Sequence, residues 1–269
     1  NKNELILLIG FHDLNKLIST KNTINLMSSK FWNFFYYPNF KKINLDLIFK
    51  FLSNYLLNKI YFFNVIIEND KTESLEYKKK FCLFKNIKIT QSFHAQSENY
   101  IDIKKLNDLK IKNDFIARSK KILDSYLQKK CKIFFIHIRK GDYDLVNHGL
   151  NISLPLEWYF KCIDMIEKKF SNCKFIICTD DKSIFKEFNN PEKFILSFND
   201  DKIDFCLMSL CNGGIMSASS FSWWAAWFSN NLNNREEKFF LAPKFWMGFT
   251  INEWFPKNIK TKFINYIDV

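Results

Sequence analysis

Four chemically active side chains stand close together in the sequence, directly after an apolar run: His137, Arg139, Lys140 and Asp142. The run itself, IFFI at residues 133–136, has the composition of a strand that is buried on both faces of a sheet. Gly141 gives the backbone the freedom to turn as it leaves this strand. Open α/β sheets bind ligands beyond the carboxyl ends of their strands. An imidazole and two cations at such an end predict a site for an anionic ligand, and phosphate is the expected group.

The elements that position this site follow it in the sequence. Apolar spacing beyond residue 150 predicts helices over 156–170, 183–188, 203–211 and 221–228, and strands over 174–178, 194–198, 214–216 and 238–242. Strands that alternate with helices at this spacing indicate right-handed βαβ units and a parallel sheet. The fold class predicted for this half is therefore α/β and Rossmann-like, although neither G-x-G-x-x-G nor a P-loop sequence accompanies it.

The first half of the chain carries weaker patterns. They predict strands over 4–10 and 59–67, a helix that includes Leu14, Leu17 and Ile18, a helix over 45–57, and an exposed loop or helix face over the charged run 68–80. A helical stretch over 107–130 leads up to the central strand. We place the lobe boundary in this stretch, which gives an N-terminal lobe of residues 1–125 and a C-terminal lobe of residues 126–269.

Two segments resemble signature sequences of the α-1,2-fucosyltransferase family, glycosyltransferase family 11, of the bacterial type. HIRKGDY at residues 137–143 resembles H-x-R-R-G-D-Y, and SASSFSWWAAWF at 217–228 resembles N-S-S-F-S-W-W-G-A-W-L. Between them, TDD at 179–181 and DFCLMSLC at 204–211 resemble further family segments in the same order. QSENY at 96–100 is a weaker match upstream. The resemblance covers roughly the second half of the chain.

This resemblance implies a GT-B-like fold with two Rossmann-like lobes. The C-terminal lobe would bind GDP-fucose and the N-terminal lobe would form the acceptor side. The implied reaction is an inverting transfer of L-fucose from GDP-β-L-fucose to a hydroxyl of a galactose-terminated glycan, with α-1,2 linkage. No cofactor and no metal ion are expected. One alternative is a related transferase with another linkage or acceptor, because acceptor choice belongs to the part of the chain with the weakest resemblance. Another is an inactive relic, because Lys140, Ala218 and Ala225 depart from the family pattern and the Gly-rich turn of the family's first unit is missing.

Arg139 is the first candidate catalytic residue. Departure of GDP develops negative charge on the β-phosphate, and a planar guanidinium can bind two phosphate oxygens at once. Lys140 is a donor-binding candidate that acts as a point charge, where the family has a second Arg. An ion pair between Arg139 and a nearby carboxylate such as Asp142 is the structural alternative. Asp142 is itself a catalytic candidate as general base, with Asp144 and Glu157 as further options.

The other candidate residues are donor-binding. The resemblance places His137 against the nucleotide, at its guanine or ribose, whereas a strand-end histidine bonded to a backbone carbonyl is the alternative. Asp180 and Asp181, at a strand exit, could accept hydrogen bonds from guanine or ribose. The last three candidates stand at the start of the helix predicted over 221–228: Ser219, Ser220 and Phe221. The serine hydroxyls and the N–H groups of the first helical turn suit an anion. A serine there can also act as an N-cap, and the two roles are compatible.

Composition limits the remaining function classes. The net charge of +12 favours an anionic partner, although lysines scattered over solvated faces give the same total. A nucleic-acid binder would interleave aromatic and basic residues on one surface. Here the basic residues nearest a motif cluster at one strand exit, so we expect no nucleic-acid partner. The sequence D-Y-D at 142–144 matches the D-x-D metal site of other glycosyltransferases, but adjacent cations can neutralise a diphosphate without a metal.

Cysteine usage and hydropathy bear on location. The seven cysteines are odd in number and form no C-x-x-C pair, which suggests neither a disulfide framework nor a zinc site and fits a reducing compartment. No run of eighteen apolar residues occurs. We expect a cytoplasmic protein, with peripheral association at the inner face of the membrane as an option. The chain begins with Asn1 rather than Met, so we expect further residues before it.

Overall fold

The computed structural model of the chain describes residues 6–8, 18–19, 23–25, 63–69, 74–78, 84–90, 110–126, 131–143, 152–232 and 237–269. The chain divides into two compact units. The first comprises Asn1–Ala95 and Asn99–Lys112, and the second comprises Gln96–Glu98 and Asn113–Val269.

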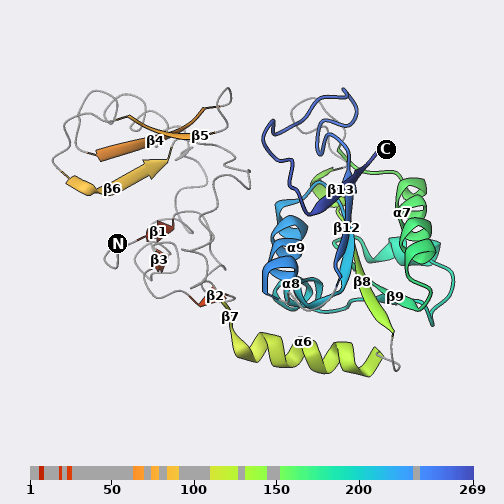
Figure 1. Cartoon of the computed structure of the whole chain (residues 1–269). Coiled ribbons are helices and arrows are strands. Elements are labelled where there is room, and N and C mark those ends of the chain that lie inside the picture. Colours follow the sequence, from red (N-terminus) through yellow and green to blue (C-terminus); the bar gives the residue numbers. More distant parts are fainter. Residues whose placement is uncertain are drawn as a thin grey trace, which may run out of the picture. The chain divides into compact units, whose positions relative to one another are not determined.

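A six-stranded sheet forms the centre of the second unit (Figure 1). Its strand order is β10-β9-β8-β11-β12-β13, and every neighbouring pair is parallel. The strands are β8 Lys132–Ile138, β9 Cys173–Thr179, β10 Phe194–Leu196, β11 Gly213–Met216, β12 Phe239–Pro243 and β13 Ile264–Ile267. The chain moves outward from β8 to β10 and then returns to place β11 on the other side of β8. The topological switch point therefore falls between the carboxyl ends of β8 and β11, where open α/β sheets bind ligands.

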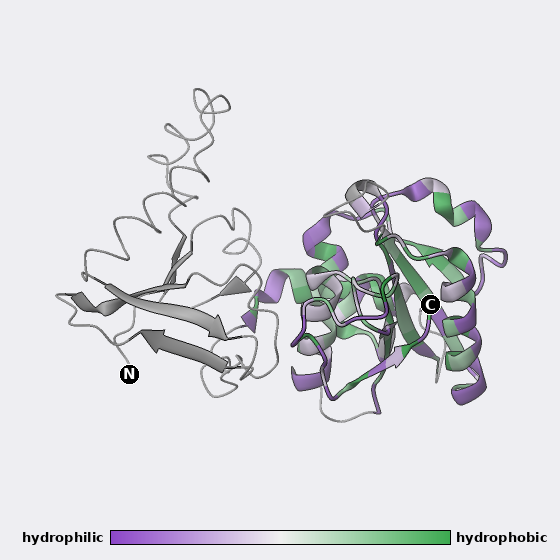
Figure 2. Cartoon of the chain, turned by 90° about the horizontal axis from the view of Figure 1, so that it is seen from above, coloured by the Kyte–Doolittle hydropathy of each residue, from purple (hydrophilic) through white to green (hydrophobic). Residues whose placement is uncertain are grey.

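Helices cover both faces of this sheet (Figure 1). Helix α7, Leu156–Lys169, lies on one side, and α8, Asp201–Leu210, and α9, Ser220–Leu232, lie on the other. Helix α6, Asn113–Tyr126, packs against α8. Figure 2 shows hydrophobic residues along the strands and hydrophilic residues on the outer faces of the helices. Strand β8 is buried from Ile133 to Ile138, which explains its unbroken apolar run.

A close approach of two strands requires a glycine at one position in the sheet. Gly214 in β11 is the register partner of Phe135 in β8. A Cβ on Gly214 would lie 2.5 Å from the Phe135 ring. The aromatic ring therefore packs directly over the glycine backbone, and this contact helps to hold β11 against β8 at the switch point.

The observed elements confirm the α/β class and the parallel sheet of the C-terminal lobe. The helices and strands predicted beyond residue 150 are present, with ends that differ by a few residues. The predicted helix over 183–188 is a 3₁₀ helix, η5, at Lys182–Glu187. Strand β13 was not predicted. The boundary at residues 125 and 126 stays a prediction; it falls in the last turn of α6, and the whole of this helix belongs to the second unit.

The described strands of the first unit form three small sheets. β1, Ile6–Leu8, pairs parallel with β3, Thr23–Asn25, and β2, Ile18–Ser19, pairs antiparallel with β7, Lys110–Ile111. β4, Phe63–Asn69, lies between antiparallel β5, Ser74–Lys78, and parallel β6, Phe84–Thr90.

Two expectations for the first unit are wrong. The run 68–80, expected as a loop or helix face, contains strand β5, whose S-L-E-Y-K sequence alternates polar and apolar residues as a strand does. Ile18, expected in a helix, lies in β2 and pairs with Ile111. The helix predicted over 45–57, the segment 96–100, and residues Leu14 and Leu17 lie outside the described residues.

Candidate functional site

An ion pair at the strand exits holds Arg139. Strands β8 and β9 end in register, with Ile138 beside Thr179, so the next residues along each strand, Arg139 and Asp180, are neighbours. Arg139 Nη1 lies 3.2 Å from Asp180 Oδ2, and the Arg139 side chain is 40% exposed. The other carboxylate oxygen, Asp180 Oδ1, accepts a hydrogen bond of 2.9 Å from the backbone N–H of Lys140. Asp180 thus fixes both the guanidinium and the backbone that carries it.

The turn after Arg139 depends on a glycine. Gly141 begins the 3₁₀ turn η4, Gly141–Tyr143, with φ of +24°, a value that L side chains rarely adopt. A Cβ at this position would lie 2.7 Å from Asp180 Oδ2. The glycine therefore permits the turn and also leaves room for the carboxylate that holds Arg139.

Tyr143 connects the two strand exits across the switch point. Its hydroxyl donates a hydrogen bond of 2.9 Å to the carbonyl oxygen of Ala218, which follows β11. Arg139 Cζ lies 5.9 Å from the centre of the Tyr143 ring, within range of a cation–π contact. One side chain thus contacts both the guanidinium and the segment that leads into α9. The prediction did not assign Tyr143 a role, although it belongs to the HIRKGDY segment.

His137 lies buried beneath these groups at the end of β8. Its Nδ1 and the hydroxyl of Ser217 share a hydrogen bond of 2.7 Å, and its ring centre lies 5.6 Å from that of Phe221. Burial, followed by the positive charge of Arg139, lowers the pKa of His137 to about 3. The imidazole is therefore neutral near pH 7 and does not add charge to an anion site. Its partner is a serine hydroxyl rather than the backbone carbonyl considered above.

The first turn of α9 is held by serine hydroxyls. Ser219 Oγ accepts a hydrogen bond of 3.3 Å from Phe221 N–H, so Ser219 has the predicted capping role. Ser222 Oγ donates to the carbonyl oxygens of Ser217, at 3.3 Å, and Ser219, at 3.1 Å. Ser220 is exposed at the first position of the helix. The helix start thus presents a hydroxyl and backbone N–H groups next to the exit of β8.

Two other donor-binding candidates have local partners. Lys140 Nζ donates a hydrogen bond of 3.0 Å to Ser153 Oγ. Asp181 caps η5 by accepting hydrogen bonds from the N–H of Ser183, at 3.0 Å, and its hydroxyl, at 2.6 Å. These bonds lower the pKa of Asp181. Contacts of Lys140 and Asp181 with a nucleotide stay predictions.

The side chain of Asp142 and the whole of Asp144 lie outside the described residues. Glu157, the third candidate base, is exposed in the first turn of α7. The roles of Arg139, Asp142, His137 and the other candidates in catalysis or donor binding stay predictions.

A buried carboxylate near the same edge was missed as a candidate. Asp204 in α8 is 7% exposed and accepts a hydrogen bond from Ser197 Oγ. Burial raises the pKa of Asp204 to about 6, against the opposing effect of that hydrogen bond and of Lys182. Lys182 Nζ in turn donates a hydrogen bond of 2.6 Å to the Ser197 carbonyl oxygen. The available signal was an aspartate among the apolar residues of the DFCLMSLC segment.

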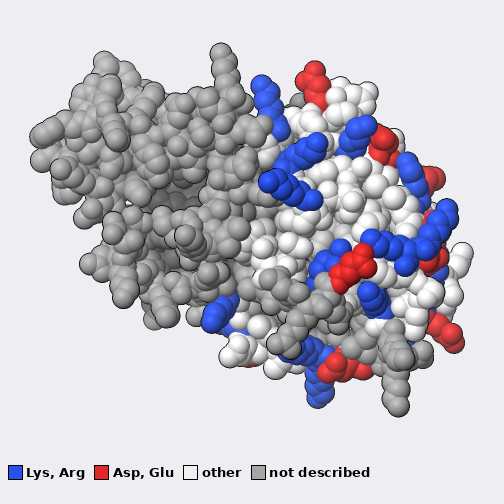
Figure 3. Space-filling model, viewed as in Figure 1, with Lys and Arg blue, Asp and Glu red and all other residues white. Residues whose placement is uncertain are grey.

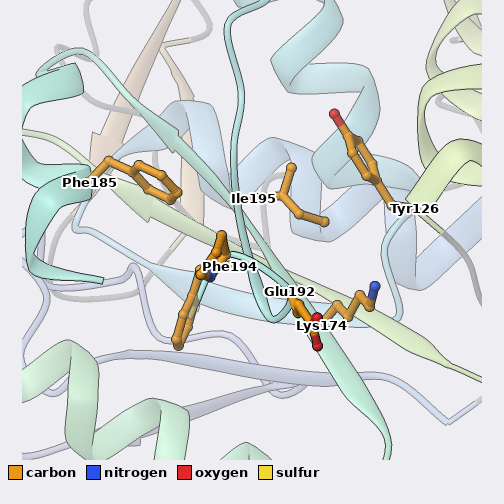
Figure 4. Close-up of a pocket in the computed structure, with 7 residues that line it drawn as sticks. Tyr126, Lys174, Phe185, Glu192, Phe194 and Ile195 are labelled. Carbon is orange, nitrogen blue, oxygen red and sulfur yellow. The ribbon is translucent and has the colours of Figure 1, made fainter. Parts of the chain in front are cut away.

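A separate cavity lies at the amino ends of β9 and β10, and Figure 4 shows residues that line it. Its volume is about 470 Å³, and its lining comprises Tyr126, Lys174, Phe185, Pro191, Glu192, Phe194 and Ile195. Lys174 and Phe194 stand at the amino ends of β9 and β10. The cavity is therefore distinct from the charged residues at the carboxyl edge, where the chemistry of the side chains places the candidate site.

Charges of both signs are spread over the face of the second unit that Figure 3 shows. Figure 3 shows Lys and Arg side chains distributed over the visible face of the second unit, with Asp and Glu side chains among them. Within the described residues, no group of three or more His, Cys, Asp and Glu side chains is arranged to hold a metal ion. No helix in the described ranges is long and apolar enough to cross a membrane.

Comparison with known proteins identifies the family. The family model for Glycosyl transferase family 11 matches residues 14–235, well over half of the chain. The chain belongs to this family. This chain is 28% identical to an E. coli protein, O-antigen biosynthesis glycosyltransferase WbnK, over 197 residues, which are 70% of this chain and 60% of that protein. An α-1,2-colitosyltransferase from E. coli is 35% identical over 107 residues, 35% of this chain and 36% of the relative. The chain thus spans between about a third and three fifths of the length of these relatives.

Two solved structures show a weaker likeness. POFUT1 in complex with GDP has 10% identity and a TM-score of 0.46, over 58% of this chain and 55% of that one. The fucosyltransferase NodZ from Bradyrhizobium has 15% identity and a TM-score of 0.37, over 55% of this chain and 53% of that one.

Proposed function

We propose that this glycosyltransferase moves L-fucose from GDP-β-L-fucose to a galactoside hydroxyl and forms an α-1,2 linkage with inversion at the sugar carbon. The observation that carries the proposal is the arrangement at the switch point. Arg139, held by Asp180, and the N-terminus of α9 flank the exits of β8 and β11, and Tyr143 contacts both sides. Cationic and N–H donors placed in this way suit a diphosphate, the leaving group of such a donor.

The leaving group determines what the site must do. As the bond between the sugar and GDP breaks, negative charge grows on the β-phosphate, and fixed donors that meet this charge lower the barrier. A guanidinium carries five N–H donors, so Arg139 can bind phosphate oxygens while it keeps its contact with Asp180. Ser220 and the backbone N–H groups of the first turn of α9 supply further donors, assisted by the helix dipole. Lys140 adds a point charge.

The acceptor hydroxyl must lose a proton as it attacks. We assign this proton to Asp142, which lies in the η4 turn, close after the strand end that leads to Arg139. Attack from the face opposite GDP converts the β-linked donor sugar into an α-linked product. The first unit is proposed to supply the acceptor side, and the departing charge is proposed to be met by protein groups without a metal ion.

A colitosyl donor is the second candidate substrate. It is favoured by the 35% identical relative that is named as an α-1,2-colitosyltransferase. Both candidates use the same site and differ in the sugar that the donor carries.

A transfer assay tests the proposal. The chain is incubated in EDTA with GDP-fucose, or with a GDP-linked colitosyl donor, and a β-galactoside, and the product is analysed by mass spectrometry and NMR. We expect one deoxy sugar in α linkage to O2 of galactose. Release of GDP without transfer, a product linked at another hydroxyl, or a requirement for added metal would each contradict a stated part of the proposal.

A further inference from the structure

One large apolar side chain stands in solvent at the same edge of the sheet as the candidate site. Phe198 is 81% exposed, the largest value for a large apolar side chain in the described part of the chain. Single apolar side chains are common on protein surfaces, so exposure alone carries little. The position of Phe198 and the rigidity of its backbone make it informative.

The backbone on both sides of Phe198 is fixed by hydrogen bonds. Ser197 N–H donates to the carbonyl oxygen of Ile177 at 2.9 Å, and the Ser197 carbonyl oxygen accepts from Lys182 Nζ at 2.6 Å. On the other side, the backbone N–H of Asn199 donates to Ser197 Oγ at 3.4 Å, and Asn199 Nδ2 donates to the same oxygen at 2.9 Å. The phenyl ring is therefore presented by an ordered segment, as a preorganised binding surface requires.

The strand order places this ring in line with the candidate site. Phe198, Asp180 and Arg139 follow the neighbouring strands β10, β9 and β8. Neighbouring strands lie about 4.8 Å apart, so the exits of β10 and β8 are roughly 10 Å apart. A nucleoside diphosphate has a length comparable to this distance. With its diphosphate at Arg139, its base can therefore reach the exit of β10.

In the opposite direction from Arg139, toward β11 and β12, other parts of the chain cover the carboxyl edge of the sheet. Helix α9 begins beyond the exit of β11, and the segment 244–263 beyond β12 packs on this helix through a 3.0 Å hydrogen bond from Trp223 Nε1 to Thr261 Oγ1. Trp246 in the same segment is completely buried. The direction from Arg139 toward β10 is thus the one that leads to an exposed aromatic ring.

We propose that Phe198 is the stacking platform for the base of the nucleotide donor. The inference rests on the proposed function and adds a residue that sets donor affinity without touching the diphosphate. An aromatic ring stacks on any nucleobase, so Phe198 provides affinity rather than discrimination between bases.

Calorimetric titration of the full chain with two probes tests this role. GDP carries a base, and inorganic diphosphate does not. Loss of one stacked base corresponds to a decrease in affinity of about 5- to 150-fold. We expect this decrease for GDP in Phe198→Ala and Phe198→Leu, with diphosphate affinity unchanged. Phe198→Tyr keeps the ring and should bind GDP as the unmodified chain does.

Ile251→Ala is the matched control, because Ile251 is a 49% exposed apolar residue outside the proposed site. Unchanged GDP affinity in Phe198→Ala would overturn the platform while leaving the donor site in place. Equal losses for GDP and diphosphate, or full affinity in Phe198→Leu, would also overturn stacking. Failure of the unmodified chain to bind GDP would instead refute the proposed function, and this inference with it.

Discussion

Gly141 and Asp180 are expected to be energetically coupled through the space that they share. In Gly141→Ala, the new Cβ would stand 2.7 Å from Asp180 Oδ2, and the residue would keep a φ of +24°. A left-handed backbone costs an L residue roughly 1–2 kcal/mol. The carboxylate must also move, which disrupts its contacts with Arg139 and with the N–H of Lys140.

The size of this second effect follows from the exposure of the pair. The Arg139 and Asp180 side chains are 40% and 26% exposed, so their ion pair contributes only about 0.2–1 kcal/mol after solvent screening. The hydrogen bond from Lys140 N–H adds about 0.5–1.5 kcal/mol. Displacement of Asp180 should therefore cost roughly 1–2 kcal/mol beyond the backbone strain.

A double-mutant cycle separates the two contributions. In Asp180→Ala the contacts are already lost, and the Cβ that Gly141→Ala introduces would have no carboxylate to displace. The glycine substitution should therefore cost only the backbone strain in that background. Urea unfolding of the four proteins should give a coupling energy of about 1–2 kcal/mol, with the double variant more stable than additivity predicts. Costs that add to within about 0.5 kcal/mol would refute the shared-space argument.

Three further changes test other parts of the structure. Tyr143→Phe removes the hydroxyl that donates to the Ala218 carbonyl oxygen, so it should lower the free energy of unfolding by about 1 kcal/mol and weaken GDP binding. If both values stay unchanged, this hydrogen bond contributes neither to stability nor to the GDP site. Burial raises the pKa of Asp204, so the stability contributed by its protonated form is fully present below about pH 4 and is lost as pH rises through about 6. Relative to Asp204→Asn, the free energy of unfolding of the unmodified chain should fall by roughly 2–3 kcal/mol across this range, measured by urea unfolding, and a pH-independent difference would contradict the burial argument. Gly214→Ala pushes a Cβ to 2.5 Å from the Phe135 ring and should cost about 1–3 kcal/mol in thermal unfolding, whereas an unchanged midpoint would show that the strands separate without strain.

The strand and its charged exit were predictable because they depend on local sequence. The apolar run before Arg139 has one interpretation in an α/β chain, and the predicted strand lies within β8. The partner of Arg139 was not predictable from proximity in sequence. Asp180 is far from Arg139 in the sequence, yet an ion pair joins them, because the register of β8 and β9 brings two strand exits together. Register is set by packing across the whole sheet, which local patterns do not specify.

Burial is the second property that the sequence did not reveal. Asp204 and Phe198 lie close together in the sequence, yet the carboxylate is enclosed and the phenyl ring is in solvent. Residue type predicts the reverse for both. Strand β13 was missed for a related reason, because I-N-Y-I becomes a strand by pairing with β12. Such exceptions arise from tertiary contacts and can mark functional positions.

Titration of the chain with GDP in the presence of EDTA, by calorimetry, tests the central claim most directly. Arg139→Ala is compared with Arg118→Ala, which removes an exposed arginine from α6. The account predicts that GDP binds without metal and that loss of two charge-assisted contacts in Arg139→Ala weakens binding by roughly 2–4 kcal/mol, with the control unaffected. Absence of GDP binding, its loss in EDTA, or equal affinities for the Arg139→Ala variant and the unmodified chain would contradict it.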